Sequence, residues 1–226
     1  MENKIMFKTT DLAIGHEDRV LCSGISFEIH EGDCIMLCGA NGSGKTTLMK
    51  TILKKASNDE EMIMIPARIP KVAGFTLKEF VRLSCFTQSD LAGRLSPSQE
   101  EDLDNSIRAL GLNHLSDRDI STLSDGEFQK AGIASALVRK ASIIMLDEPT
   151  AFLDAQNRIS ILETLKNICC SGHRPAVIFS THDLHDGLAV CNRVFAIGTD
   201  RTFHISADNT PEAKSETVAK IFNKLA

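Results

Sequence analysis

A glycine-rich segment at residues 39–46 constrains the fold of this chain more than any other part of its sequence. The segment reads Gly39, Ala40, Asn41, Gly42, Ser43, Gly44, Lys45 and Thr46. The apolar run Ile35-Met36-Leu37 comes before it, and the residues from Lys45 onward have the pattern of a helix. A buried strand, a glycine turn and a helix in this order predict an anion site, because free backbone N–H groups converge at the start of the helix.

The side chains of the same segment indicate which anion it binds. Its glycines leave backbone N–H groups free for phosphate oxygens, and the Lys45 ammonium would neutralise the β- and γ-phosphates of a nucleotide. The Thr46 hydroxyl would be a ligand of Mg²⁺. We therefore predict that residues 39–46, together with Thr47, bind ATP and Mg²⁺, and that Lys45 also takes part in catalysis.

A second chemical signal lies at the end of the apolar run at residues 143–146, where Asp147 and Glu148 follow directly. In open α/β sheets, ligands bind at the carboxyl ends of the strands. Asp147 suits a contact to Mg²⁺, and Glu148 would accept a proton from the attacking water or orient it. These two carboxylates predict hydrolysis in addition to nucleotide binding.

The remaining pattern predicts how these two signals are joined. The apolar runs at residues 143–146 and 177–179 are typical of parallel strands that are covered on both faces, and Ile63-Met64-Ile65 predicts a further strand. From about Arg68 to Ala141 the chain becomes helical, and both Ser96 and Ser124 begin segments with the spacing of a capping box. We predict an α/β fold in one domain over residues 1–226, with a helical subdomain inserted in the core at about residues 69–141.

Composition argues against several classes of function. With 25 basic and 30 acidic residues the net charge is −5, so we expect no nucleic-acid partner. No apolar stretch reaches the length of about 18 residues that a membrane helix needs, so we expect no direct membrane insertion. The first residues lack a long apolar run, and we expect no signal peptide. The seven cysteines complete no zinc pattern, so we interpret them as reduced and mostly buried.

Several motifs in one order resemble the ATP-hydrolysing subunits of ABC transporters. The glycine segment is followed by Leu123-Ser124-Asp125-Gly126-Glu127, then by Asp147-Glu148-Pro149-Thr150, Phe152-Leu153-Asp154 and Ser180-Thr181-His182-Asp183. The resemblance covers nearly the whole chain. It implies a P-loop NTPase core that carries a helical subdomain and an antiparallel β-subdomain.

The resemblance also implies roles for single residues. Ser124 and Gly126 would contact the γ-phosphate of an ATP held by a second subunit, so the working unit would be a head-to-tail homodimer with two shared sites. Asp154 would communicate between these sites, and His182 would hydrogen-bond the γ-phosphate and take part in catalysis. For two of these residues a plainer role remains open, because Ser124 has the pattern of a helix cap and Asp154 that of a turn or cap.

The chain departs from the family pattern at two positions. An aromatic residue normally stacks on adenine, but this chain has no Tyr or Trp, and His16 stands at the matching place. A glutamine normally touches Mg²⁺ and the water, but the corresponding residue is Ala67; Gln88 lies too close to Ser124 to replace it. The stretch between Lys45 and Ala67 is also short, which indicates a reduced β-subdomain.

The resemblance therefore implies an ATPase that powers a transporter. The form of its motifs favours importers of iron-siderophore, haem or cobalamin. Transmembrane permease subunits would be the partners, and the chain would lie in the cytoplasm, on the inner face of the membrane. Two alternatives remain: a soluble ABC ATPase that is not part of a transporter, and a nucleotide-binding regulator with weak hydrolysis.

Overall fold

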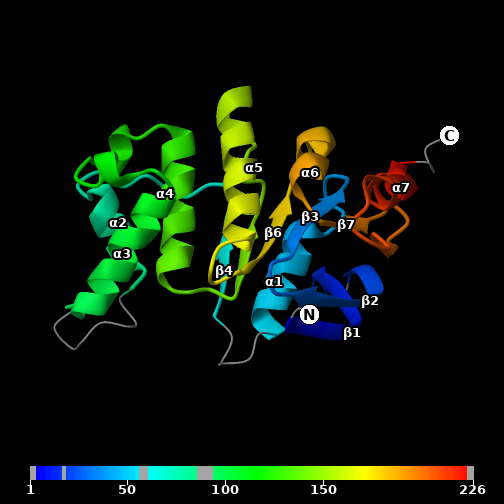
Figure 1. The fold of residues 1–226 in the computed structure, drawn as a ribbon. Coiled ribbons are helices and arrows are strands. Elements are labelled where there is room, and N and C mark those ends of the chain that lie inside the picture. The colour runs from blue at the N-terminus through cyan, green and yellow to red at the C-terminus, as the bar shows by residue number, and fades with distance from the viewer. Residues whose placement is uncertain (1–3, 17–18, 56–60, 86–93, 223–226) are drawn as a thin grey trace.

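The computed structural model describes residues 4–16, 19–55, 61–85 and 94–222, and Figure 1 shows their fold. The strands are β1 (Ile5–His16), β2 (Arg19–His30), β3 (Cys34–Gly39), β4 (Met62–Ile65), β5 (Ile143–Leu146), β6 (Ala176–Ser180), β7 (Arg193–Ile197) and β8 (Phe203–Ile205). The α-helices are α1 (Lys45–Lys55), α2 (Leu77–Leu83), α3 (Pro97–Ala109), α4 (Asp125–Val138), α5 (Ala155–Cys169), α6 (Leu184–Val190) and α7 (Pro211–Phe222). Two 3-10 helices, η2 (Asn113–Leu115) and η3 (Ile120–Thr122), lie between α3 and α4.

A six-stranded sheet in the order β4-β5-β6-β3-β7-β8 forms the centre of the molecule. Its strands pair in parallel, except that β8 runs antiparallel to β7. Every residue of β3, β5 and β6 is buried, as in a parallel sheet with both faces covered. The carboxyl ends of these three strands meet at one edge of the sheet. The structure confirms the α/β fold and brings the two chemical signals of the sequence to the same edge.

Alternate residues of the strands belong to two separate apolar cores. In β3, Ile35 and Leu37 pack with α1 and with the β1–β2 hairpin, whereas Cys34, Met36 and Cys38 face the core formed with α4 and α5. The same alternation holds in β5 and β6. Because side chains alternate across a strand, a sheet with helices or strands on both faces needs apolar residues at every position.

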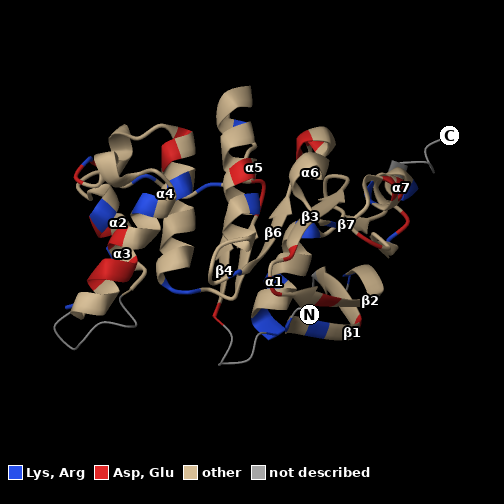
Figure 2. Cartoon of the chain, viewed as in Figure 1, with Lys and Arg blue, Asp and Glu red and all other residues tan. Residues whose placement is uncertain are grey.

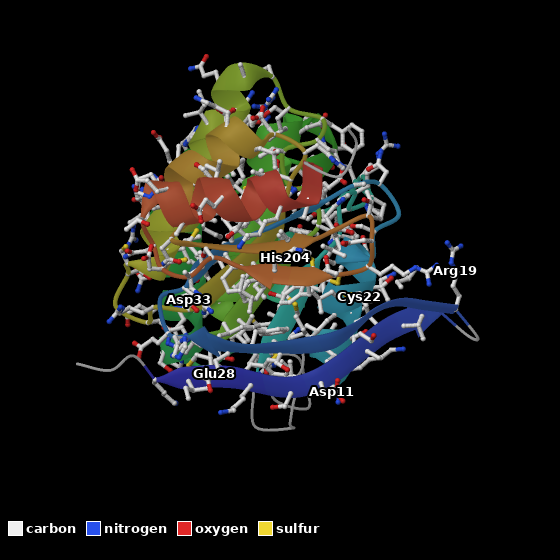
Figure 3. The ribbon with its side chains drawn as sticks, turned by 90° about the vertical axis from the view of Figure 1, so that its right-hand side faces the viewer. Asp11, Arg19, Cys22, Glu28, Asp33 and His204 are labelled. Atoms are coloured by element: carbon white, nitrogen blue, oxygen red, sulfur yellow. The ribbon has the colours of Figure 1, made fainter. Side chains whose placement is uncertain are left out.

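The N-terminal hairpin is an antiparallel pair, β1 with β2, that covers part of one face of the sheet. In the view of Figure 3, Glu28 and Asp33 lie at one end of this hairpin and Arg19 at the other. The Asp33 carboxylate is buried; it accepts a hydrogen bond from the backbone N–H of His30 at 2.8 Å and one from Arg193 at 2.6 Å. This ion pair joins the end of the hairpin to β7. The two-stranded sheet agrees with the reduced antiparallel β-subdomain predicted from the sequence.

The helices between β4 and β5 pack on one another at the left of Figure 1, next to α5. The α-helices α2, α3 and α4 each begin with a complete capping box, formed by Thr76 with Glu79, Ser96 with Gln99 and Ser124 with Glu127. Ion pairs join α2 to α3, and Figure 2 shows the two signs of charge side by side on these helices. Helices α3 and α4 start where the capping pattern predicts. Whether residues 69–141 act as a separate subdomain stays a prediction.

The cysteines and the helix lengths bear on two other expectations. All seven cysteines are free; Cys170 is exposed and the other six are buried, which confirms that they are mostly buried. Among the described residues, no helix combines the length and the apolar character needed to cross a membrane. No group of three or more His, Cys, Asp or Glu in the described ranges is arranged to hold a metal ion.

Candidate functional site

The glycine segment forms a tight loop between β3 and α1, and the shape of this loop requires glycine, which has no side chain, at two positions. A Cβ atom on Gly39 would lie 2.6 Å from Ser43 Oγ and 2.7 Å from the carbonyl oxygen of Ile197, too close for any other residue. Gly44 has φ +108°, which a residue with a side chain rarely adopts, and its Cβ would meet Ile14 of β1 at 3.0 Å. Ser43 Oγ is buried without a hydrogen-bond partner. The loop therefore offers both backbone N–H groups and an unpaired hydroxyl to an anion.

Lys45, the first residue of α1, is buried beneath this loop, with 6% of its surface exposed. Its ammonium donates to the carbonyl oxygens of Gly39 at 2.9 Å and of Ala40 at 3.2 Å. Burial lowers the pKa of Lys45, and the carboxylates of Glu148 and Asp147 partly offset this effect. A buried cation at the start of a helix attracts a multiply charged anion.

A chain of hydrogen bonds connects the start of α1 with the ends of β5 and β6. The Thr46 hydroxyl donates to one carboxylate oxygen of Asp147 at 2.7 Å, and the Ser180 hydroxyl donates to the other at 2.8 Å. Ser180 Oγ also accepts the backbone N–H of Glu148 at 2.7 Å. Both oxygens of Asp147 are thus engaged, and a single serine fixes Asp147 and Glu148 relative to each other.

Glu148 and His182 meet at the open side of this network. His182 Nε2 lies 2.6 Å from Glu148 Oε1, and both side chains are partly exposed. The backbone of Glu148 has φ +48°, an uncommon value for a residue other than glycine, and such strain is often found at functional sites. The structure therefore brings together the carboxylate and the imidazole that the sequence singled out.

Among the described residues, Glu148 lines the walls of three cavities. The smallest, of about 170 Å³, is lined by Asn41, Gly42, Gly44, Lys45, Thr46, Thr47 and Glu148. A second, of about 300 Å³, is lined by Glu148, Thr150, Ala151, Arg158, Thr181, His182 and Asp183. The largest, of about 580 Å³, contains Ala67 and Asp125 as well as Glu148. Glu148 is therefore accessible both from the glycine loop and from the side of the helices α2–α4.

The residues predicted to serve a second subunit lie at the start of α4. Ser124 is the N-cap of that helix: its hydroxyl accepts the N–H of Glu127 at 3.3 Å, and the Glu127 side chain accepts the N–H of Ser124 at 2.8 Å. Gly126 packs against α5, where an added Cβ would lie 3.0 Å from Asn157 Oδ1. Ser124 therefore caps α4 in the structure. Its contact with a second subunit stays a prediction.

Asp154 is the N-cap of α5, the plainer of the two roles that the sequence left open. Its carboxylate accepts the backbone N–H of Asn157 at 2.8 Å and the side-chain N–H of the same residue at 2.9 Å. The backbone hydrogen bond from Asn157 is the main reason that the pKa of Asp154 is lowered. Its role in communication between two sites stays a prediction.

The two departures from the family pattern have different outcomes. The side chain of His16 lies outside the described residues, although its strand reaches the loop, where Ile14 lies close to Gly44. Ala67 is half-buried two residues after β4 and lines the 580 Å³ cavity together with Glu148. Gln88 lies outside the described residues. The methyl group of Ala67 therefore faces the cavity where the family pattern expects an amide.

Sequence reasoning missed residues that hold the site together. Ser180 was part of a quoted motif, and its position at the end of an apolar strand could have indicated a buried polar role. Arg158 is paired with the carboxylate of Asp183, next to His182. No local pattern could have found this pair, because its partners lie on α5 and at the start of α6.

Comparison with known proteins identifies the family. A family model described as ABC transporter matches residues 22–151. The zinc import ATP-binding protein ZnuC of Agrobacterium fabrum is 30% identical over 220 residues, which cover 95% of this chain and 70% of that protein. The petrobactin import ATP-binding protein FpuD of Bacillus anthracis is 26% identical over 210 residues, or 84% of this chain and 77% of FpuD. Other relatives are named for the import of aliphatic sulfonates.

Solved structures support the same conclusion for the fold. An inward-facing ABC transporter described as of metal-chelate type aligns with a TM-score of 0.81 at 22% identity, covering 96% of this chain and 88% of that chain. At this identity the likeness shows the fold alone. Together with the family model and the ZnuC relative, it leads to one conclusion: the chain belongs to the ABC transporter family, as one of its ATP-binding (ATPase) subunits.

Proposed function

We propose that this subunit hydrolyses ATP at residues 39–46, Asp147, Glu148 and His182 to power an importer. The observation that carries the proposal is the hydrogen-bond chain from Thr46 through Asp147 and Ser180 to Glu148. It joins a loop that can hold phosphates to the backbone N–H of the residue whose carboxylate can activate water. Such a connection is what hydrolysis of a phosphate anhydride requires, because the water must be oriented toward the terminal phosphate.

In this proposal each side chain has a separate task. Lys45 and the backbone of the loop hold the phosphates, and Glu148 accepts the proton of the attacking water or orients it. His182 holds the Glu148 carboxylate from its free side and reaches the terminal phosphate. The hydroxyl of Thr46 and the carboxylate of Asp147 are hard oxygen donors 2.7 Å apart, which fits Mg²⁺. When bound, the ion would offset negative charge on the phosphates.

The same proposal includes a homodimer. Ser124 and Gly126 lie at the start of α4, away from the loop in the chain but at a helix N-terminus, where N–H groups and the helix dipole favour an anion. A second subunit placed head to tail would bring this end of α4 to the phosphates, and Asp154 would lie between the two sites. Support comes from the exposure of Ser124, whose hydroxyl remains accessible while it caps the helix.

For the partner and cargo, we propose transmembrane permease subunits that import an iron-siderophore, haem or cobalamin. The chain would then work in the cytoplasm, on the inner face of the membrane. The support is the form of the motifs and the relative named for petrobactin import. Relatives named for zinc and for aliphatic sulfonates define the competing cargoes.

The experiment that tests this proposal isolates the tagged chain from native membranes in mild detergent. We expect a multispanning membrane protein to co-purify and Mg²⁺-dependent ATP hydrolysis to rise in the complex. Uptake by a strain that lacks the gene is then compared for iron chelates, haem, cobalamin, zinc and sulfonates. Consistent absence of a membrane partner would favour the soluble ATPase, and loss of zinc or sulfonate uptake alone would overturn the cargo class.

One observation favours a second candidate function, a nucleotide-binding regulator with weak hydrolysis. Ala67 offers a methyl group to the cavity that it shares with Glu148, so no side-chain amide at that position can hold the water or the metal. A regulator needs to bind ATP and change shape, but not to turn it over rapidly. Turnover that stays low in the presence of the membrane partner would support this candidate over the motor.

A further inference from the structure

We propose that Arg158 is a positioning residue that keeps His182 in contact with Glu148 by anchoring the loop between β6 and α6 to α5. This inference rests on the proposed function, because it assigns a residue to the same hydrolytic site. Arg158 lies in the first turns of α5 and lines the 300 Å³ cavity together with Glu148 and His182.

The first step concerns the support of His182. Its side chain is about half exposed, and the contact described for it is the one between Nε2 and Glu148. A side chain with so little packing takes its position from its backbone. That backbone is a short loop between Thr181, which is buried, and Asp183, whose carboxylate pairs with Arg158 of α5.

The second step concerns the two oxygens of Asp183, which have different partners. Oδ1 accepts the N–H of Asp186 at 3.2 Å and so caps α6, while Oδ2 accepts a hydrogen bond from Arg158 Nη1. Arg158 also lies 3.9 Å from the carboxylate of Asp186. The guanidinium therefore ties the start of α6 to α5, with Nη1 facing both carboxylates.

The third step joins this anchor to Glu148. The segment that follows Glu148 enters α5 at Asp154, the N-cap of that helix, and the N–H of Arg158 bonds to the carbonyl of Asp154 at 2.9 Å. The loop of Glu148 and the loop of His182 are thus attached to the same turn of α5. Their relative position depends on that turn, and Arg158 is the attachment on the His182 side.

Charge supports the same assignment. While His182 contacts the carboxylate of Glu148, the Arg158 guanidinium faces the carboxylates of both Asp183 and Asp186. Its ion pairs are only partly exposed, so removing the guanidinium would leave Asp183 poorly compensated. We expect the loop to move away, and the contact between His182 and Glu148 to be lost, while residues 39–46 remain unchanged.

The test compares steady-state ATP hydrolysis of the full-length wild type with Arg158→Gln, Arg158→Lys and Asp183→Asn. Since a misplaced group near the chemistry can cost up to about a hundredfold, we expect Arg158→Gln to lower kcat by roughly tenfold or more. KM for ATP should stay within about twofold, because the phosphate loop is untouched. Arg158→Lys should restore part of the activity. Lys166→Gln, which removes an exposed charge from the same helix, is the matched control.

A double variant decides whether Arg158 acts through Asp183. Asn keeps the helix-capping oxygen but not the charge, so Asp183→Asn should show the same loss, and the double variant should show no further loss. Additive losses, or a wild-type kcat in Arg158→Gln, would overturn the inference. A raised KM with unchanged kcat would overturn it as well, because Arg158 would then bind nucleotide.

Hydrogen exchange separates this inference from the proposed function. Backbone amides at residues 181–187 should exchange faster in Arg158→Gln than in the wild type and in Lys166→Gln, with no change in β6. Unchanged exchange there would reject the positioning role, whatever the hydrolysis rate. If the wild type shows no ATP hydrolysis, or only hydrolysis that does not depend on Glu148, the proposed function is rejected instead. The exchange comparison would still decide the role of Arg158.

Discussion

The edge of the sheet and the helices between β4 and β5 are held together in different ways. At the sheet edge, hydrogen bonds join residues far apart in the chain, such as Thr46 with Asp147 and Ser180 with Glu148. In α2, α3 and α4, each start is held by a side chain and a backbone N–H three residues apart. The comparison teaches that the reactive groups depend on the whole fold, whereas each helix start depends on four residues.

The largest effect that would test this comparison concerns Glu148. We expect Glu148→Gln to keep ATP binding and to lower hydrolysis by roughly a hundredfold or more, the scale of a lost general base. The amide is close in shape to the carboxylate, so the network around it remains. Nucleotide binding by calorimetry and turnover by phosphate release measure the two parts. Near-normal turnover would exclude Glu148 as the residue that activates water.

The next effect concerns Ser180, whose bridging role between Asp147 and Glu148 no local spacing predicts. Ser180→Ala removes the hydroxyl from Asp147 and leaves the N–H of Glu148 without its partner, so we expect a loss of about 1–3 kcal/mol in the free energy of unfolding. Turnover should fall by about tenfold or more, because both carboxylates lose their common support. Chemical denaturation and the ATPase assay check these values. A variant as stable and as active as the wild type would show that the sheet edge does not depend on this serine.

A smaller effect distinguishes a local cap from a shared site. Ser96 and Ser124 cap α3 and α4 with similar geometry, so Ser96→Ala and Ser124→Ala should each cost about 1 kcal/mol in the free energy of unfolding. The proposed homodimer predicts that only Ser124→Ala also lowers hydrolysis. The two variants are compared by denaturation and by turnover at high protein concentration. Equal ATP hydrolysis by the two variants would show that Ser124 acts only as a helix cap.

The smallest expected effect concerns Ala67, which lies between the two regions. We expect Ala67→Gln to raise Mg²⁺-dependent hydrolysis by a few-fold, about 1 kcal/mol in the barrier, because the new amide can reach the cavity beside Glu148. Ala67→Leu, of comparable size but apolar, is the control. If both variants have unchanged or lower activity, either Ala67 does not occupy the place of the family glutamine, or the missing amide does not slow hydrolysis.

The sequence predicted the local features of both regions well. The capping boxes at Ser96 and Ser124 need only residues three apart, and the apolar runs of β3, β5 and β6 are continuous because both faces of the sheet are covered. Asp147 and Glu148 were placed correctly because a parallel sheet gathers the carboxyl ends of its strands. Each of these inferences depends on a short stretch of chain.

What the sequence did not predict lies between such stretches. The bridge through Ser180 and the pair of Arg158 with Asp183 require the distance between two elements, which no local spacing encodes. The hairpin was expected only from a resemblance, although Ile25, Phe27 and Ile29 alternate with more exposed residues in β2. Alternation of this kind is the pattern of a half-covered strand, and it was the missed signal.

The position of Lys45 has a consequence for the energetics of nucleotide binding. Its ammonium already has two acceptors within its own loop, so the arrival of a phosphate exchanges partners and does not simply add a contact. Because burial also lowers the pKa of Lys45, the bound phosphates would restore its affinity for a proton. Binding at alkaline pH would then take up protons from solution, and the apparent affinity for ATP would weaken as the pH rises. The loop thus couples nucleotide affinity to the acidity of its surroundings.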